Sequence, residues 1–155
     1  MIRLEVISPA RTVVDTDVEM VVLPAEDGLI GFLPGHAPTV VAMAPGVLSY
    51  TRGHETLRLA VGGGFCEVTP ARVLVLADSA ERSDEIDVER ARAAFEQARA
   101  RLDRELSDRD HERAEAALKR ATARLQVAGA WRRKFAYTGR AGRRRAPTAE
   151  ERDET

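Results

Sequence analysis

The hydrophobic periodicity of this chain changes once, near residue 83, and this change constrains the fold more than any other feature. Before it, polar and apolar residues alternate with a period of two, as in 2–7 and 17–22. Such alternation places one face of a strand on a core. After it, apolar residues recur every three or four positions, which is typical of amphipathic helices. The sequence therefore predicts an all-β region over residues 1–82, followed by a helical region.

The β region consists of short strand-like segments separated by turn signals. Further apolar runs occupy 47–50, 56–61 and 72–76. Between the runs lie residue pairs typical of turns, about every ten residues: Ser8-Pro9, Asp27-Gly28, Pro34-Gly35, Pro45-Gly46, Arg52-Gly53 and Thr69-Pro70. No segment here is a helix long enough to connect parallel strands. We therefore expect an antiparallel β-sandwich or barrel.

The helical region contains two apolar rows with a break between them. The first row is Val88, Ala91, Phe95, Ala98 and Leu102, with Ser83 and Asp84 as the predicted N-cap. The break covers 107–110 and is short enough to favour two antiparallel helices. The second row is Ala114, Leu118, Ala121, Leu125 and Ala128, and Gly129 is the predicted end. Because alanine buries little area, the sequence predicts a weakly held, mobile hairpin.

The net charge of −1 conceals a division between the two regions. Residues 1–82 hold six basic and ten acidic groups, whereas the rest hold 18 basic and 15 acidic groups. The two parts therefore carry −4 and +3. Residues 132–145 contain seven basic groups and no acidic one. We expect a disordered basic tail over 136–155, because it offers little to bury.

No group of residues in the sequence has the pattern of a catalytic or metal site. Gly62-Gly63-Gly64 leads into a strand and lacks the lysine of a phosphate loop, so a bulge or a close backbone approach is expected. The three histidines are not at metal-ligand spacing. Cys66 cannot form an internal disulfide and is predicted to be a buried thiol in a reducing compartment. We expect a protein that binds rather than an enzyme, with no required cofactor. The sequence also has no apolar run of membrane-spanning length and no signal peptide at its start.

One segment resembles a known family. Residues 26–38 read Glu-Asp-Gly-Leu-Ile-Gly-Phe-Leu-Pro-Gly-His-Ala-Pro, which is similar to the characteristic loop of the epsilon subunit of F-type ATP synthases. The segments 63–68 and 75–80 also match in order, and the resemblance spans roughly 1–135. It implies a sandwich of about ten short antiparallel strands over 1–82 and a helical hairpin over 83–135.

The resemblance also implies partners and a role. The sandwich would dock on the gamma subunit and on the polar loops of the c-ring, coupling rotation to ATP synthesis without catalysis. The contact residues would include Glu26, Asp27, Leu29 and His36. The hairpin would be a regulatory arm that inhibits ATP hydrolysis, with Lys119, Arg120 and Arg124 facing an acidic segment of beta in the alpha/beta head. The chain would lie at the cytoplasmic face of the bacterial cell membrane, attached only through the complex and without nucleic acid.

The start of the predicted first helix matches a nucleotide motif of the family. Some bacterial members bind ATP through Ile/Leu-Asp-x-x-Arg-Ala, and this chain carries Ile86, Asp87, Arg90 and Ala91 in that pattern. The resemblance implies a regulatory ATP site completed by Arg120 and Arg124. The alternative interpretation is an acidic helix cap followed by a surface arginine.

A second function remains open from the residues alone. The arginine-rich hairpin and tail are compatible with a small adaptor that binds nucleic acid, since basic clusters release counterions from polyphosphates. Salt-sensitive retention of residues 84–155 on nucleic acid, without binding to a gamma subunit, would favour that adaptor.

Overall fold

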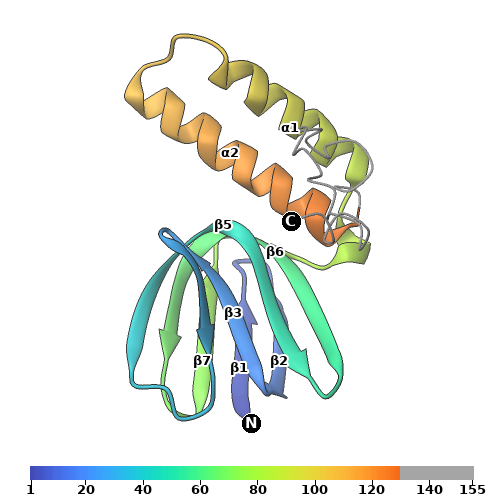
Figure 1. Cartoon of the computed structure of the whole chain (residues 1–155). Helices are drawn as coiled ribbons and strands as arrows, with labels where there is room; N and C mark the ends of the chain where they lie inside the picture. The colour runs from blue at the N-terminus through green and yellow to red at the C-terminus, as the bar shows by residue number, and fades with distance from the viewer. Residues whose placement is uncertain (130–155) are drawn as a thin grey trace, which may run out of the picture.

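The computed structural model describes residues 1–129 and shows a β-sandwich carrying two packed helices (Figure 1). The described residues contain eight strands: β1 (Ile2–Ile7), β2 (Thr12–Val18), β3 (Met20–Ala25), β4 (Gly28–Phe32), β5 (Thr39–Arg52), β6 (Glu55–Val68), β7 (Arg72–Ala77) and β8 (Ala80–Glu81). The predicted sandwich with a helical hairpin is confirmed. The predicted tail, 136–155, and the last part of the predicted hairpin lie outside the described residues.

Two long strands build both layers of the sandwich. The hydrogen-bonded order is β2-β1-β7-β6-β5-β3-β4, with β8 paired to β6. The first part of β5 pairs with the end of β6 beside β7, whereas its second part pairs with β3 and the start of β6. Both strands bend over the top of the sandwich (Figure 1). One folded sheet therefore supplies two facing layers.

The period-two pattern produces the sandwich core. Ile2, Leu4 and Val6 on β1 are buried, whereas Arg3 between them is exposed. Val73 and Val75 on β7 are buried in the same cluster. Alternate residues of each strand thus fill the space between the layers, as the sequence predicted.

Two expectations about the strands are wrong. β1 pairs with β7 in parallel, although antiparallel pairing was expected throughout. The connection between these strands runs through the opposite layer of the sandwich instead of through a helix. Pro45-Gly46 is not a turn but lies within β5, where the strand bends. A Cβ on Gly46 would lie 2.7 Å from the Cβ of Pro24, so glycine permits the close approach of β3.

The helices begin and end at capping residues. A short 3-10 turn, η1 (Ser83–Glu85), precedes α1 (Val88–Leu102), and α2 (Asp108–Val127) follows. The side chain of Asp87 caps α1 by accepting from the Arg90 amide at 3.1 Å. The predicted cap at Ser83 and Asp84 is wrong because those residues form η1. Ser107 caps α2, and Gly129 follows it with φ of +71°, as expected.

Candidate functional site

The interface between α2 and the sandwich joins the two parts of the molecule. Helix α2 crosses the bend of β5 and β6, and α1 packs on α2 (Figure 1). Ile86, Phe95 and Leu125 form a second hydrophobic cluster together with Ala60 of β6. The other buried members are alanines: Ala91, Ala121 and Ala123. The predicted alanine seam is therefore real, and Phe95, Leu125 and Ile86 are the larger buried side chains of the cluster.

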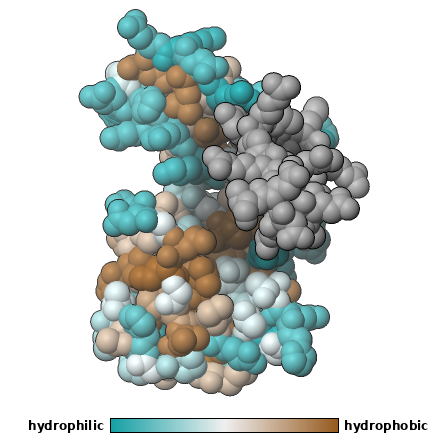
Figure 2. Space-filling view, viewed as in Figure 1, coloured by the Kyte–Doolittle hydropathy of each residue, from teal (hydrophilic) through white to brown (hydrophobic). Residues whose placement is uncertain are grey.

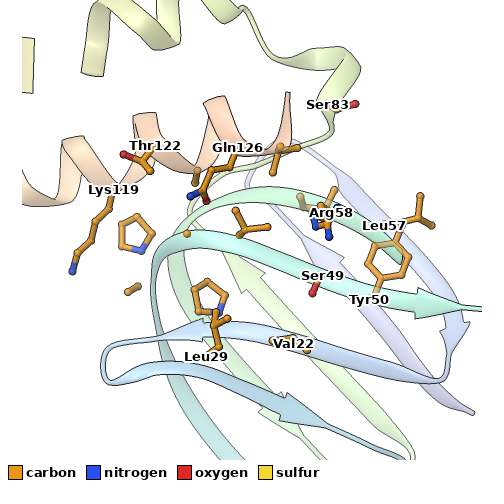
Figure 3. Close-up of a pocket in the computed structure, with 18 of the residues that line it drawn as sticks. Val22, Leu29, Ser49, Tyr50, Leu57, Arg58, Ser83, Lys119, Thr122 and Gln126 are labelled. Atoms are coloured by element: carbon orange, nitrogen blue, oxygen red, sulfur yellow. The ribbon is translucent and has the colours of Figure 1, made fainter. Parts of the chain in front are cut away.

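An open groove runs beside this interface. It has a volume of about 1470 Å³ and lies between the turn connecting β3 and β4, the bend of β5, and the end of α2 (Figure 3). Figure 2 shows it as a notch between the hairpin and the sandwich, with hydrophobic residues on the sandwich side. Lys119, Thr122 and Gln126 line it from α2, and Tyr50, Leu57 and Arg58 line it from the sandwich.

A bidentate ion pair connects α2 to the sandwich. Arg124 Nη2 lies 2.8 Å from Glu81 Oε1, and Arg124 Nε lies 3.1 Å from both carboxylate oxygens. Both side chains are about 30% exposed. A guanidinium that binds both oxygens of a carboxylate is held in orientation as well as in distance. This pair therefore fixes the docked position of α2 on β8.

The segment before α1 is tied to the sandwich by side chains. A guanidinium nitrogen of Arg82 donates to the carbonyl of Val13, and Arg11 pairs with Glu85. The Arg82 amide donates to Glu85 Oε2 at 2.9 Å, and the Glu85 amide donates to the Arg82 carbonyl at 3.1 Å. The hydrogen bond from the Arg82 amide, together with Arg11, lowers the pKa of Glu85. Residues 82–85 are thus attached to β2 and its preceding turn.

The four residues of the predicted ATP motif lie at the start of α1. Ile86 and Ala91 are buried in the hairpin cluster, Asp87 is the helix cap, and Arg90 is exposed. None of them lines the groove described above. Because the helices are antiparallel, this end of α1 lies beside the end of α2 that carries Arg124 (Figure 1). Arg124 is engaged by Glu81, and Arg120 is half-buried on the preceding turn.

The residues of the family-like loop do not form one surface. Glu26 and Asp27 make the turn between β3 and β4, and Glu26 and Leu29 line the groove with Lys119. His36 lies beyond the other end of β4, where its ring meets Phe32 edge-on at 4.8 Å. The β3–β4 register pairs Ala25 with Gly28 at one end of the strand and Val21 with Phe32 at the other. The structure thus places the acidic turn beside the hairpin and His36 at the opposite end.

An exposed apolar patch covers three neighbouring strands. Val40 on β5, Phe65 on β6 and Leu76 on β7 are 72%, 61% and 52% exposed. Phe65 pairs with Leu76 and with Ala42, two residues from Val40 on the same face. A small hollow of about 170 Å³ lies between them. An exposed apolar surface that extends over neighbouring strands is a candidate interaction site. Sequence reasoning missed this patch because strand pairing, not sequence proximity, assembles it.

The glycine run and the cysteine have structural roles. Gly64 has φ of +129°, and a Cβ there would lie 2.1 Å from the carbonyl oxygen of Leu76. Of the two structures expected for the glycine run, a bulge or a close backbone approach, the structure shows the close approach, between β6 and β7 at Gly64. Cys66 is buried, which raises the pKa of its thiol to about 12. The described residues contain no group of three side chains that could hold a metal ion, and none of their helices has the length and apolarity needed to span a membrane.

Sequence reasoning also missed Glu81, Arg11 and Arg82. Each makes its principal contact with a residue at least 43 positions away, namely Arg124, Glu85 and Val13. No periodic pattern along a strand or helix reports such a contact.

The fold and the interface between its two parts define a structural class: a β-sandwich with a docked helical hairpin. The comparisons with known proteins agree with this class over all of residues 1–129. Residues 1–83 match the family described as the ATP synthase delta/epsilon chain β-sandwich domain, and residues 84–129 match its long α-helix domain. The chain belongs to the delta/epsilon chain family of ATP synthases.

Curated relatives are ATP synthase epsilon chains of bacteria. The chain is 45% identical over 108 residues to that of Desulforamulus reducens, covering 70% of this chain and 82% of the relative. It is 45% identical over 128 residues to that of Bacillus subtilis, covering 83% and 97%. Neither these relatives nor the structural matches are nucleic-acid adaptors, so the comparisons give that alternative no support.

Two solved assemblies contain chains of similar structure. A chain in the Euglena gracilis mitochondrial ATP synthase, OSCP/F1/c-ring, has a TM-score of 0.68 and 27% identity, covering 82% of this chain and 80% of that one. A chain in the central stalk/c-ring of the Tetrahymena thermophila enzyme has a TM-score of 0.58 at 10% identity, covering 82% and 96%, which shows the shared fold.

Proposed function

We propose that this chain is the central-stalk subunit that couples rotation of the c-ring and the gamma subunit to ATP synthesis, and that its hairpin inhibits ATP hydrolysis. The observation that carries the proposal is the connection between the two parts of residues 1–129. A sandwich with an exposed apolar patch carries a hairpin that is held mainly by alanines, a few larger apolar side chains and the Arg124–Glu81 ion pair. The catalytic sites belong to other subunits of the complex. The chain requires no cofactor for this role.

The gamma subunit is proposed to cover the patch of Val40, Phe65 and Leu76. A permanent partner would remove this apolar surface from water and so gain affinity from it. Phe65→Asp should reduce co-purification with gamma, because the aspartate would bury an unpaired charge at the interface. Met20→Asp, which changes another exposed apolar residue on β3, is the matched control and should leave co-purification unchanged. Equal binding by both variants would place gamma elsewhere.

The acidic turn of Glu26 and Asp27, with the neighbouring Leu29, is proposed to meet the polar loops of the c-ring. All three side chains are exposed. His36 lies at the far end of β4 and therefore belongs to a different contact. Within the complex, this arrangement would hold the chain at the cytoplasmic face of the bacterial cell membrane.

The hairpin is proposed to leave the sandwich and reach the alpha/beta head. In the docked structure Lys119 lines the groove and Arg124 is bound to Glu81. Arg124 becomes free only if α2 undocks, and the undocked helix would present it together with the exposed Lys119 and the half-buried Arg120. Their charge would then suit an acidic segment of beta. Inhibition and docking thus use the same arginine and exclude each other.

ATP is proposed to regulate this exchange through Asp87, Arg90, Arg120 and Arg124, with Ile86 and Ala91 holding the helix start in place. A phosphate would have to replace Glu81 at Arg124, since both compete for one guanidinium. Millimolar ATP should raise the melting temperature of the chain, and Arg90→Ala should abolish the rise. Arg101 is an exposed arginine at the other end of α1. Arg101→Ala is therefore the control and should retain the rise in melting temperature. An unchanged melting temperature in the unaltered chain would exclude the site.

A further inference from the structure

The hairpin must pivot somewhere if it is to leave the sandwich, and the contacts of the connecting segment identify the place. The amide of Asp78 donates to Gly63 at 3.0 Å, and the amide of Gly62 donates to Ser79 at 2.9 Å. Strand β8 then pairs with Ala60 and Val61 of β6. The chain is therefore part of the sheet up to Glu81.

Beyond the sheet, side chains continue the attachment. Arg82 reaches back to the carbonyl of Val13, and Arg11 holds Glu85. Glu85 in turn accepts from the Arg82 amide. These four residues form a closed set of contacts, hereafter the strap. Two contacts therefore attach the strap to residues 11–13, at the start of β2 and just before it.

The attachment by hydrogen bonds and ion pairs stops before Ile86, whose side chain packs in the cluster that includes Ala60 of β6. In the described part of the chain, no backbone hydrogen bond joins Ile86 or Asp87 to the sandwich. Both have extended backbone angles, with φ and ψ of −82° and 122° at Ile86 and −77° and 102° at Asp87. Asp87 already belongs to α1, because it caps the helix. Ile86 is held by apolar packing in the hairpin cluster, which undocking would release.

We infer that residues 82–85 remain on the sandwich when the hairpin undocks, and that the pivot is Ile86–Asp87. The inference rests on the proposed undocking of the hairpin and specifies how it occurs. Glu81 then stays on the sandwich while Arg124 departs with α2. The strap thus keeps the acidic half of the ion pair in place for re-docking.

Crosslinking in the full-length chain tests the pivot. Cysteines replace Arg11 and Glu85 in one variant and Glu81 and Arg124 in another, and each pair is joined by a short bis-maleimide. The native Cys66 is buried with its thiol pKa raised to about 12, so it does not compete for the reagent. Hydrogen exchange of the α1 and α2 amides then reports undocking. Uncrosslinked samples of each variant are the controls.

The expected results differ sharply between the two crosslinks. A crosslink between positions 11 and 85 should leave the amide hydrogen exchange of α1 and α2 unchanged, because the strap does not move. Joining 81 to 124 should slow that exchange by about tenfold or more, because undocking is blocked. Slower exchange in the helices of the 11–85 variant would overturn the inference and place the pivot before residue 82.

The same two crosslinked chains, assembled into the ATP synthase, separate this inference from the proposed function. The 11–85 chain should inhibit ATP hydrolysis as the unaltered chain does, and the 81–124 chain should not. If the exchange results hold but no version of the chain inhibits hydrolysis, the pivot stands and the inhibitory role fails.

Discussion

Arg124 and Glu81 lie 43 positions apart in sequence, yet the guanidinium and the carboxylate meet through three contacts of 2.8–3.1 Å. Among the ion pairs of residues 1–129, it is the one that ties α2 to the sandwich. The remaining contact surface is formed largely by alanines and a few larger apolar groups. The docked state of the hairpin is therefore sensitive to this pair.

Glu81→Gln should weaken the docking of the hairpin. The substitution removes the charge but keeps the size of the side chain, so it reports the ion pair itself. We expect a loss of about 1 kcal/mol, a moderate value for a partly exposed bidentate pair, and about fivefold faster amide exchange in α2. Glu89→Gln is the control, because Glu89 pairs with Arg92 within α1 alone. Equal exchange in both variants would show that the Arg124 pair does not hold the hairpin.

Phe95→Ala should unfold or release the hairpin while the sandwich survives. Phe95 is 7% exposed and is the largest side chain of a cluster built mainly of alanines, so its loss leaves a cavity that small neighbours cannot fill. We expect a cost of about 3 kcal/mol, measured as a loss of helical circular dichroism at lower denaturant. Phe65→Ala truncates an exposed phenylalanine of the sandwich and should leave the helical signal intact. Full helicity in Phe95→Ala would contradict the assigned packing.

Gly64→Ala should destabilise the sandwich far more than Gly28→Ala. Both glycines have φ near +128°, so both substitutions strain the backbone. Only at Gly64 would the new Cβ also collide with the carbonyl of Leu76, whereas Gly28 faces open space. We expect about 1 kcal/mol at Gly28 and more than about 3 kcal/mol at Gly64 in denaturant unfolding. Similar losses at both positions would mean that strain alone, without the close approach, determines the cost.

The buried thiol of Cys66 should make the stability of the sandwich fall with rising pH. Its pKa is raised to about 12 by burial, whereas the pKa of a cysteine in the unfolded chain is about 8.5. The folded state thus binds the proton more tightly. The stability that the protonated thiol contributes to folding is fully present below about pH 8.5. Above that pH the free energy of unfolding declines, by at most about 1.4 kcal/mol per pH unit, until the folded thiol also ionises. The unfolding free energy of Cys66→Ala, compared across this range, should lack that slope; an identical slope would refute the assignment.

The sequence predicted those elements whose cause is local. The rows that include Ala91, Phe95 and Leu125 follow from helical spacing, and Ser107 and Gly129 bound α2 through their own capping geometry. The apolar row predicted for α2 omits Ala123, which is buried on a second face of the helix that contacts the sandwich. A single stripe cannot describe a helix that packs on two neighbours.

Features that depend on tertiary pairing were not predictable from the sequence. The parallel pairing of β1 with β7 arises because β5 and β6 fold over the sandwich. The Arg124–Glu81 pair and the contacts of Arg11 and Arg82 join distant segments. Glu26 and His36 stand ten positions apart, but the length of β4 separates them. The residues of the loop could be recognised as family-like, whereas their division between two ends of the sandwich required the structure.

The central claim is that the sandwich couples and the hairpin inhibits, with the boundary between these roles after the strap. It is tested most directly by ATP hydrolysis in the assembled complex, comparing the full chain with a chain that ends at Glu85. The shortened chain keeps the apolar patch and the strap. We predict that it still assembles with gamma and supports ATP synthesis, and that hydrolysis becomes several-fold faster. An unchanged rate of hydrolysis, with assembly intact, would contradict the account.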